Sequence, residues 1–326
     1  MKNTIKFSVD LKNSGKRLDV YLAENLKELS RSFLKRLIEN EQVKFKDKII
    51  SSPSTKIKYK DQIIISIIEN DEQKINPKKI ELNEVYEDKD ILVINKPKGM
   101  VVHPGAGNYT NTLVNALLYK YKKNLSDMNG PLRPGIVHRI DKETSGLLVI
   151  AKNNLAHANL GDQFSKHTIK RKYLCLSWGV LRPLNGKINT LIARNKKNRQ
   201  LMMVSDVNGK KAITNYKTIK IFNIKDIPKI SLLECELETG RTHQIRVHLK
   251  YKGTSLLGDK QYGKNNVKFK KINNDFFVKL NKLSGQALHA KSLSFAHPRT
   301  KKWMSFNSDL PDTFKNILNL LENLNG

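Results

Sequence analysis

An α+β fold is what this sequence of 326 residues predicts. Short apolar runs that are typical of buried strands occur at Ile91–Asn95 and Leu147–Ala151. Two segments with the apolar spacing of helices, Thr112–Lys123 and Leu155–His167, lie outside these runs. The hydrophobic content of 39% supports a real core, and the length suffices for two domains of roughly 100–200 residues each. The segments support the class α+β and no particular sheet topology.

An N-terminal module, residues 15–75, is predicted to hold two short helices and then a small sheet. The first amphipathic helix opens at Arg17–Leu22, and the second, Phe33–Ile38, follows capping serines. Apolar and polar residues partly alternate over Ile57–Ile68, as they do in strands. Three bases lie near one helical face: Arg31, Lys35 and Arg36. They could contact RNA phosphates, or they could only solubilise the helix pair.

The segment Glu69–Lys79 is polar and has no periodicity, so we interpret it as a linker to a larger domain, the body, at residues 80–326. Within the body, Lys170–Leu176 and Leu232–Thr239 are predicted strands. Gly240 breaks the second strand, and Thr242 could cap a helix that ends at Gly253.

The charge balance favours a polyanionic partner. Sixty Lys and Arg against 30 Asp and Glu give a net charge of +30, spread along the whole chain. The chain is also rich in Lys, Asn and Ile, so part of this charge could be a compositional background.

Cysteine usage and hydropathy indicate a cytoplasmic protein. Cys175 and Cys235 lie in apolar, strand-like runs without metal-type spacing, which is typical of reduced core thiols. No apolar run approaches the ~18 residues of a membrane span, and Ile63–Ile68 is among the longest. The N-terminus lacks the apolar core of a signal peptide. We therefore expect no membrane association.

The segment Gly135–Lys152, GIVHRIDKETSGLLVIAK, is the most informative part of the chain. Asp141 lies between the basic pair His138–Arg139 and a turn of small residues, at the edge of a predicted buried strand. A lone carboxylate beside an arginine suits a nucleophile that must stay ionised and fixed in position. Taken alone, Asp141 could equally cap a helix or form an Asx-turn.

This segment resembles the HRLD-x-x-TSG signature of the RluA/RluD-type pseudouridine synthases, with Ile140 in place of the usual leucine. The resemblance extends from about Ile91 to Pro298. It implies isomerisation of uridine in RNA without a cofactor or metal, with Asp141 as nucleophile, on a mixed, mostly antiparallel sheet with flanking helices. The N-terminal module is similar to the alpha-L (ribosomal-protein S-four-like) RNA-binding domain.

The resemblance also implies roles for other residues. Tyr173 falls on the family's K-x-Y position, where the tyrosine stacks on the flipped uracil, although a strand tyrosine could simply pack. In TGRTHQIRVHLK, Arg246 is the expected salt-bridge partner of Asp141, and Arg241 is the second choice. Arg139 is placed to hold the flipped base out of its stack. His243 and His248 are five residues apart, which is unlike helical zinc ligands, so we reject a metal pair. Gly285 stands where the family usually has arginine.

The segment Asn195–Tyr216 resembles the arm of the family that closes on RNA. Its bases could neutralise several phosphates, or they could lie on a solvated loop. The expected RNA contacts are Arg139, Arg31, Lys35, Arg36, Lys197, Arg199, Arg241 and His243. We predict a monomeric pseudouridine synthase of large-subunit ribosomal RNA. The alternatives are the same chemistry on tRNA, and a catalytically silent RNA-binding factor in ribosome assembly.

Overall fold

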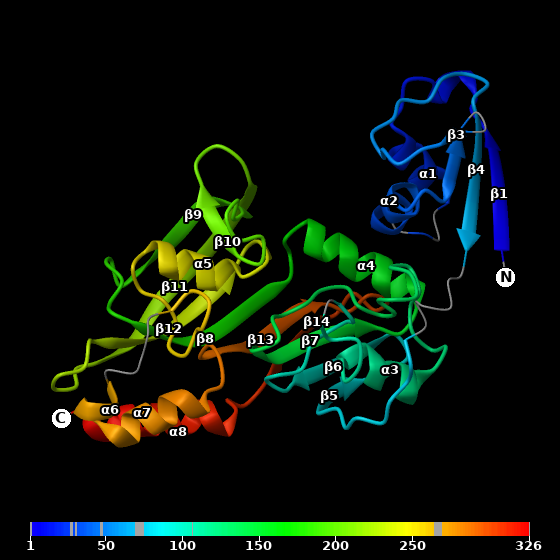
Figure 1. Cartoon of the computed structure of the whole chain (residues 1–326). Coiled ribbons are helices and arrows are strands. Elements are labelled where there is room, and N and C mark those ends of the chain that lie inside the picture. The colour runs from blue at the N-terminus through cyan, green and yellow to red at the C-terminus, as the bar shows by residue number, and fades with distance from the viewer. Residues whose placement is uncertain are drawn as a thin grey trace. The chain divides into compact units, whose positions relative to one another are not determined.

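A computed structural model describes residues 2–26, 29, 31–45, 48–68, 75–105, 107–263 and 269–325. The chain divides into two compact units (Figure 1). The first comprises Met1–Ile80, His103–Ile136 and Ala151–His157, and the second comprises Glu81–Val102, Val137–Ile150 and Ala158–Gly326.

The N-terminal part of the first unit pairs two helices with an antiparallel sheet of order β1-β4-β2-β3. Its elements are β1 (Lys2–Ser8), a 3-10 turn (Leu11–Asn13), α1 (Leu18–Asn25), α2 (Arg31–Glu39), β2 (Val43–Phe45), β3 (Lys48–Ile49) and β4 (Gln62–Ile68). The alternation in β4 turns Ile63 and Ile65 inward, where they pack with Leu22 and Leu34. Strand β1 lies before residue 15, where the sequence interpretation began this module.

Helix α3 (Leu113–Tyr121) also belongs to the first unit and matches the helix predicted at Thr112–Lys123. Thr112 and Asn115 form a capping box, in which each side chain satisfies the backbone of the other. The Asn115 amide also donates to the carbonyl of Asn76 at 2.7 Å, which ties the predicted linker to this helix.

The second unit is built on a sheet of order β10-β9-β11-β12-β8-β13-β7-β6-β5, with β14 added on β13. Its strands are β5 (Glu84–Glu87), β6 (Ile91–Lys96), β7 (Ser145–Ala151), β8 (Lys170–Trp178), β9 (Asn185–Arg194), β10 (Met202–Ser205), β11 (Lys210–Phe222), β12 (Ile230–Leu237), β13 (Leu288–Ala296) and β14 (Trp303–Asn307). The pairs between β10 and β13 are antiparallel, whereas β13 and β7 run parallel. A mixed, mostly antiparallel sheet is therefore confirmed.

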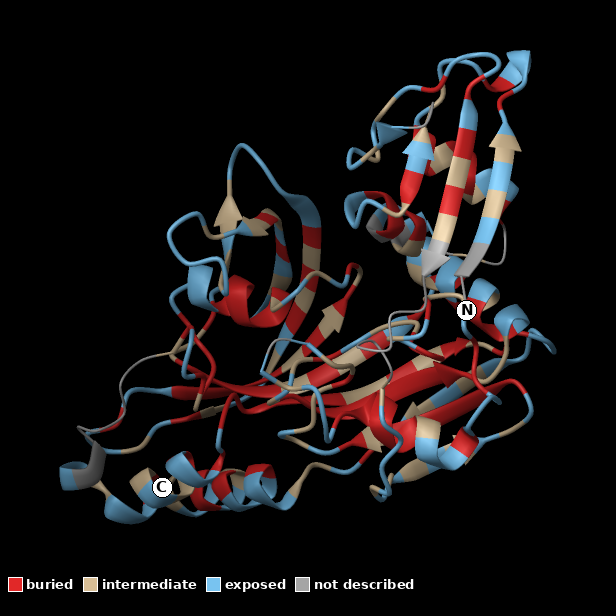
Figure 2. Cartoon of the chain, turned by 45° about the vertical axis from the view of Figure 1, so that its right-hand side comes forward, coloured by how far each residue is buried: buried red, intermediate tan, exposed pale blue. Residues whose placement is uncertain are grey.

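Continuous apolar runs and amphipathic helices explain how this sheet is covered. All seven residues of β7 are buried, as its unbroken apolar run predicts for a central strand (Figure 2). The helices of this region are α4 (Asn154–Ser165), α5 (Gln244–Tyr251), α6 (Phe269–Ile272), α7 (Asn274–Lys282) and α8 (Asp312–Leu324). Phe276 of α7 and Phe314 of α8 pack with Trp178 and Phe222 of the sheet. None of the described helices is long and apolar enough to cross a bilayer.

Candidate active site

The loop that carries Asp141 is fixed by backbone contacts on both sides. The carbonyl of Lys142 accepts hydrogen bonds from the Gly99 amide at 2.9 Å and from the Lys96 ammonium at 3.2 Å. Where β7 begins, Gly146 has φ +114°, and a Cβ there would overlap the Ala290 carbonyl. Only glycine fits this close approach of β13 to β7. The Asp141 side chain, 19% exposed, therefore projects from a rigid support.

Lys96 is the fully buried cation beneath this loop. Its ammonium donates to the carbonyls of Pro97, Met100 and Lys142 at 2.7 to 3.2 Å. Burial lowers the pKa of Lys96 to about 7, although the charges of Glu143 and Asp141 act in the opposite direction. Three carbonyl partners thus use all three protons of the charged form.

Arg246 joins Asp141 to a second, fully buried carboxylate. Its Nη1 donates to Asp141 Oδ2 at 3.0 Å, and its Nε and Nη2 donate to the two oxygens of Asp259 at 2.8 and 3.0 Å. Burial opposes the charge, but the hydrogen bonds and charge of Asp259, with that of Asp141, raise the pKa of Arg246 overall. The second-choice residue, Arg241, instead donates its Nε to the carbonyl of Lys211. Asp141 therefore faces a fixed cation.

Helix α5 begins differently from the prediction. Thr242 does not cap it: His243 is the N-cap residue, in the left-handed region at φ 56° and without a side-chain cap. The side chain of Gln244 closes the turn instead. Its Oε1 accepts from the Thr239 hydroxyl and the Arg241 amide, and its Nε2 donates to the carbonyl of Ile213. The Thr242 cap was wrong because the helix begins one residue later, at His243 in the left-handed region, and the Gln244 side chain holds the turn that precedes it.

Hydrogen bonds select one tautomer of His243. The hydroxyl of Tyr262 accepts from the Met202 amide at 2.8 Å, so its own proton is available to His243 Nδ1, also at 2.8 Å. Burial lowers the pKa of His243, which favours the neutral ring, with its proton on Nε2. That nitrogen lies 3.8 Å from Asp141 Oδ1. The nitrogens of His248 face Thr190 and Thr214 instead, so the two histidines do not share a site.

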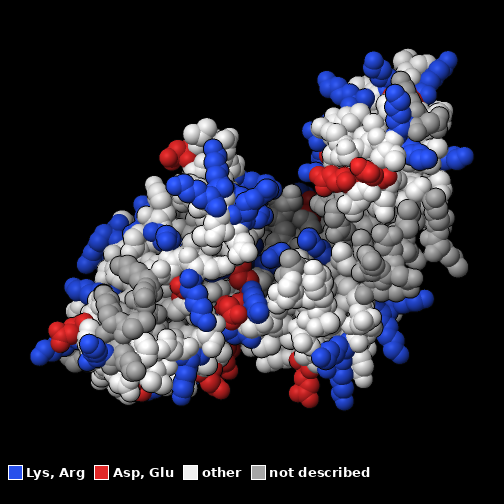
Figure 3. Space-filling model, viewed as in Figure 1, with Lys and Arg blue, Asp and Glu red and all other residues white. Residues whose placement is uncertain are grey.

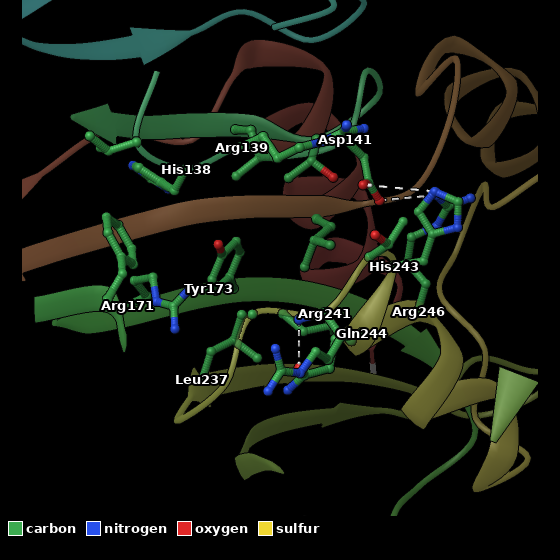
Figure 4. A pocket seen from close by; sticks show the side chains of 18 of the residues that line it. His138, Arg139, Asp141, Arg171, Tyr173, Leu237, Arg241, His243, Gln244 and Arg246 are labelled. Carbon is green, nitrogen blue, oxygen red and sulfur yellow. Dashed lines mark hydrogen bonds and ion pairs between the residues drawn. The ribbon is translucent and has the colours of Figure 1, made fainter. Parts of the chain in front are cut away.

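A pocket of about 510 Å³ opens over these groups. Asp141, His243 and Arg246 lie at one end, His138 and Arg171 lie at the other, and Tyr173 lies between them (Figure 4). Tyr173 is 6% exposed, and burial raises the pKa of its hydroxyl. The pocket thus offers a carboxylate and an aromatic ring to one ligand.

One cluster of residues of metal-ligating types is held by hydrogen bonds and ion pairs within the protein. Asp88, Asp90 and His297 have ligand atoms within 4.8 Å of one another. Arg299 pairs with both oxygens of Asp90 at 2.7 Å, and Asp88 accepts from His297 and from two backbone amides. These bonds explain the cluster as a structural clamp.

Comparisons with known proteins decide the family. Residues 90–251 match the family model described as RNA pseudouridylate synthase. An uncharacterised RNA pseudouridine synthase of Bacillus subtilis, YlyB, is 40% identical over 326 residues, which is 99% of this chain and 98% of that protein. The chain belongs to the RNA pseudouridine synthases. It is therefore an isomerase that converts uridine in RNA into pseudouridine.

Other relatives of this pseudouridine synthase carry a more specific name. "Ribosomal large subunit pseudouridine synthase D" of Zymomonas mobilis is 45% identical, covering 94% of each chain, and that of Haemophilus influenzae is 41% identical, covering 98% and 95%. The solved structure titled Human RNA Pseudouridylate Synthase Domain Containing 4 has a TM-score of 0.56 and 24% identity, covering 74% of this chain and 93% of that one. This likeness concerns the fold.

The residues expected to bind RNA lie in both units of the synthase. Arg139 is exposed at the pocket, and Lys197 and Arg199 are exposed on the segment between β9 and β10, an arm where Lys and Arg gather (Figure 3). In the N-terminal module Arg31 pairs with the buried Asp19 at 2.8 Å, and Lys35 lies 3.6 Å from Glu39. The side chain of Arg36 lies outside the described residues.

Sequence reasoning missed two groups of the site. Asp259 stands in a segment, GDKQYG, that matched the family without an assigned role. The available signal was an acid in a turn bounded by Gly258 and Gly263. Arg171 was interpreted only as part of a strand, although it stands two residues before Tyr173, at the basic position of K-x-Y, which was the available signal.

Proposed function

We propose that this pseudouridine synthase isomerises uridines of large-subunit ribosomal RNA, with Asp141 as the nucleophile. The ion pair of Asp141 and Arg246, 3.0 Å apart at the open pocket, carries this proposal. A carboxylate held by a guanidinium stays ionised and oriented for attack. The ribosomal target is supported by the relatives named ribosomal large subunit pseudouridine synthase D.

The target uridine must leave its stack before Asp141 can reach it. Flipping costs a few kcal/mol, and Arg139, exposed beside the nucleophile, fills the vacated space. The flipped uracil then stacks on Tyr173. Asp141 attacks the nucleotide at the sugar or at the ring, the glycosidic bond breaks, and the uracil rotates and rejoins the ribose through its carbon five. No atoms are gained or lost, so the isomerisation consumes no co-reactant.

The surrounding basic side chains supply the part of RNA binding that does not depend on the RNA sequence. The arm that carries Lys197 and Arg199, together with Arg241 and His243 at the pocket, contacts the RNA around the target. The N-terminal module, as an alpha-L domain, adds phosphate contacts through Arg31, Lys35 and Arg36. The ion pair of Arg31 with Asp19 holds one part of the guanidinium, and the Arg31 side chain remains 55% exposed. The enzyme acts as a cytoplasmic monomer.

Mapping pseudouridines in total RNA tests this function. Cells that carry the wild-type gene, a deletion, or Asp141→Ala are compared at nucleotide resolution. We expect large-subunit sites that disappear in both the deletion and the variant. Purified Asp141→Ala protein should bind the RNA with an affinity close to that of the wild type. Sites confined to tRNA would replace the proposed target, and no dependent site in any RNA would favour a silent assembly factor.

A further inference from the structure

Arg171 is a buried cation that the reaction scheme above does not use. It lies on β8, is 8% exposed, and lines the same pocket as Asp141 (Figure 4). Its Nε has no hydrogen-bond partner, and no carboxylate among the described residues pairs with its guanidinium. The other buried arginine of the pocket, Arg246, has two carboxylates.

The neighbours of Arg171 provide space and no counter-charge. Its guanidinium carbon lies 5.4 Å from the centre of the Phe164 ring. A Cβ at Gly240 would lie 2.6 Å from its Nη1, so glycine is what leaves room for it. Burial lowers the pKa of His138 to about 3, and this neutral ring accepts from the Val149 amide. Arg241 adds a second positive charge nearby.

Burying an unpaired cation destabilises a fold unless something compensates the charge. Among the described residues, the Phe164 ring offers a cation–π contact at 5.4 Å but no anion pairs with Arg171, which indicates that the ligand of the pocket supplies the counter-charge. Arg171 and Tyr173 are two positions apart on one strand, so both side chains project from the same face, about 7 Å apart. If the uracil stacks on Tyr173, as the proposed function has it, the groups nearest to Arg171 are those of the ring.

We propose that Arg171 is a further catalytic residue, which binds a uracil carbonyl oxygen and stabilises the negative charge that the ring takes up in the reaction. When the C1′–N1 bond breaks, its electron pair stays on the uracil and is delocalised onto the carbonyl oxygens. In the sugar route, Asp141 forms the compensating bond to C1′. In the ring route, addition at C6 pushes the ring electrons onto O4.

The second half of the reaction removes this charge again. Carbon five of the uracil attacks C1′ with an electron pair, and Asp141 leaves as a carboxylate, from C1′ in the sugar route and from C6 in the ring route. The proton on carbon five is lost and N1 gains one, so the product is an isomer of the substrate. Arg171 therefore acts on a charge that exists only after the C1′–N1 bond breaks, or after addition at C6 in the ring route, and before the bond from C1′ to carbon five forms. A fixed donor aimed at such a charge is worth about 10²–10³ in rate.

The test uses a large-subunit rRNA fragment in which the wild-type protein forms pseudouridine. Single-turnover rate constants and RNA dissociation constants are measured for Arg171→Met, Arg171→Lys and the control Arg182→Met, which removes an exposed arginine of the same unit. We expect Arg171→Met to lose about 10²-fold or more in rate with affinity within twofold, Arg171→Lys to lose less, and the control to lose nothing. A rate within threefold of wild type overturns the proposal, whereas the failure of the wild type to modify any large-subunit rRNA fragment overturns the proposed function itself.

A second arm separates the uracil from an RNA phosphate, the other anion that Arg171 could bind. A phosphate contact would weaken binding at least tenfold and leave the saturated rate unchanged, which overturns the proposal. Fluorine at carbon five makes the uracil a better leaving group. For either Arg171 variant, the loss in the rate of glycosidic bond cleavage should therefore be about tenfold smaller in RNA with 5-fluorouridine than in RNA with uridine. An equal loss on both RNAs overturns it, and Arg171→Lys carries this comparison if Arg171→Met does not fold.

Discussion

Replacing Asp259 by Asn should impair catalysis although Asp259 does not line the pocket. Asp259 Oδ1 accepts from Arg246 Nη2 and from the amides of Gln261 and Tyr262, and its Oδ2 accepts from Arg246 Nε. An amide in this place keeps the oxygen toward Oδ1 and turns its NH₂ against the N–H of Arg246. The guanidinium loses one charged hydrogen bond and its buried counter-charge together.

The magnitude follows from what Arg246 retains. Breaking a buried ion pair costs about 3–5 kcal/mol. Arg246 still has Asp141 at 3.0 Å and the side-chain Oε1 of Gln261 at 2.8 Å, so we expect a loss of about 2–3 kcal/mol in the free energy of unfolding. A displacement of the guanidinium by about 1 Å would misplace Asp141 and lower the rate about 10²-fold.

Single-turnover pseudouridine formation and urea unfolding measure the two effects. Asp275→Asn is the matched control, because Asp275 makes an exposed ion pair with Lys279 at 3.0 Å, which contributes about 0.5 kcal/mol or less. The control should leave both quantities unchanged. If Asp259→Asn lowers stability as expected but turns over at the wild-type rate, Asp259 does not position Arg246 for catalysis.

Three further substitutions test the support of the site. Lys96→Met leaves three carbonyls without a donor and should lower the free energy of unfolding by about 3 kcal/mol, measured with urea. The pKa of Lys96 in the folded protein, about 7, lies below its usual value, so the unfolded chain binds the proton more tightly. From pH 7 to 10 the free energy of unfolding of the wild type should therefore rise by about 1 kcal/mol per pH unit relative to that of the variant. Gly146→Ala forces a Cβ onto the Ala290 carbonyl at φ +114° and should lower the urea midpoint by the equivalent of about 3 kcal/mol. Tyr262→Phe removes the donor to His243 Nδ1, so the imidazole nitrogen shifts in NMR should change from one tautomer to a mixture.

Local patterns predicted the elements of the fold and not their order. The apolar run of β7 and the capping box of α3 lie within a few residues of chain, so the sequence displays them directly. The position of β13 between β8 and β7 depends on pairs such as Tyr173 with Ala290, which are remote in sequence. Burial of the whole sheet determines which strands pair, and the periodicity within a single strand does not predict its partners.

The same distinction applies to the site. Asp141 and Arg246, 105 residues apart, were paired in advance only because the resemblance to the family connects their motifs. The K-x-Y motif marks the position of Arg171 as basic, but the absence of an acid around it is visible only in the structure. That absence depends on Phe164, Gly240 and His138, which come from three separate segments.

The second carboxylate on Arg246 has a consequence for the proposed mechanism, in which Asp141 is the nucleophile. In that mechanism Asp141 forms a covalent bond to the nucleotide, becomes a neutral ester and no longer compensates the guanidinium. Arg246 is 5% exposed, so without a second acid it would then be a buried, unpaired cation, at a cost of several kcal/mol in that intermediate. Asp259 remains ionised throughout, because it takes no part in bond formation. Its charge therefore keeps the intermediate accessible, and Asp259→Asn should slow its formation more than it weakens the binding of RNA.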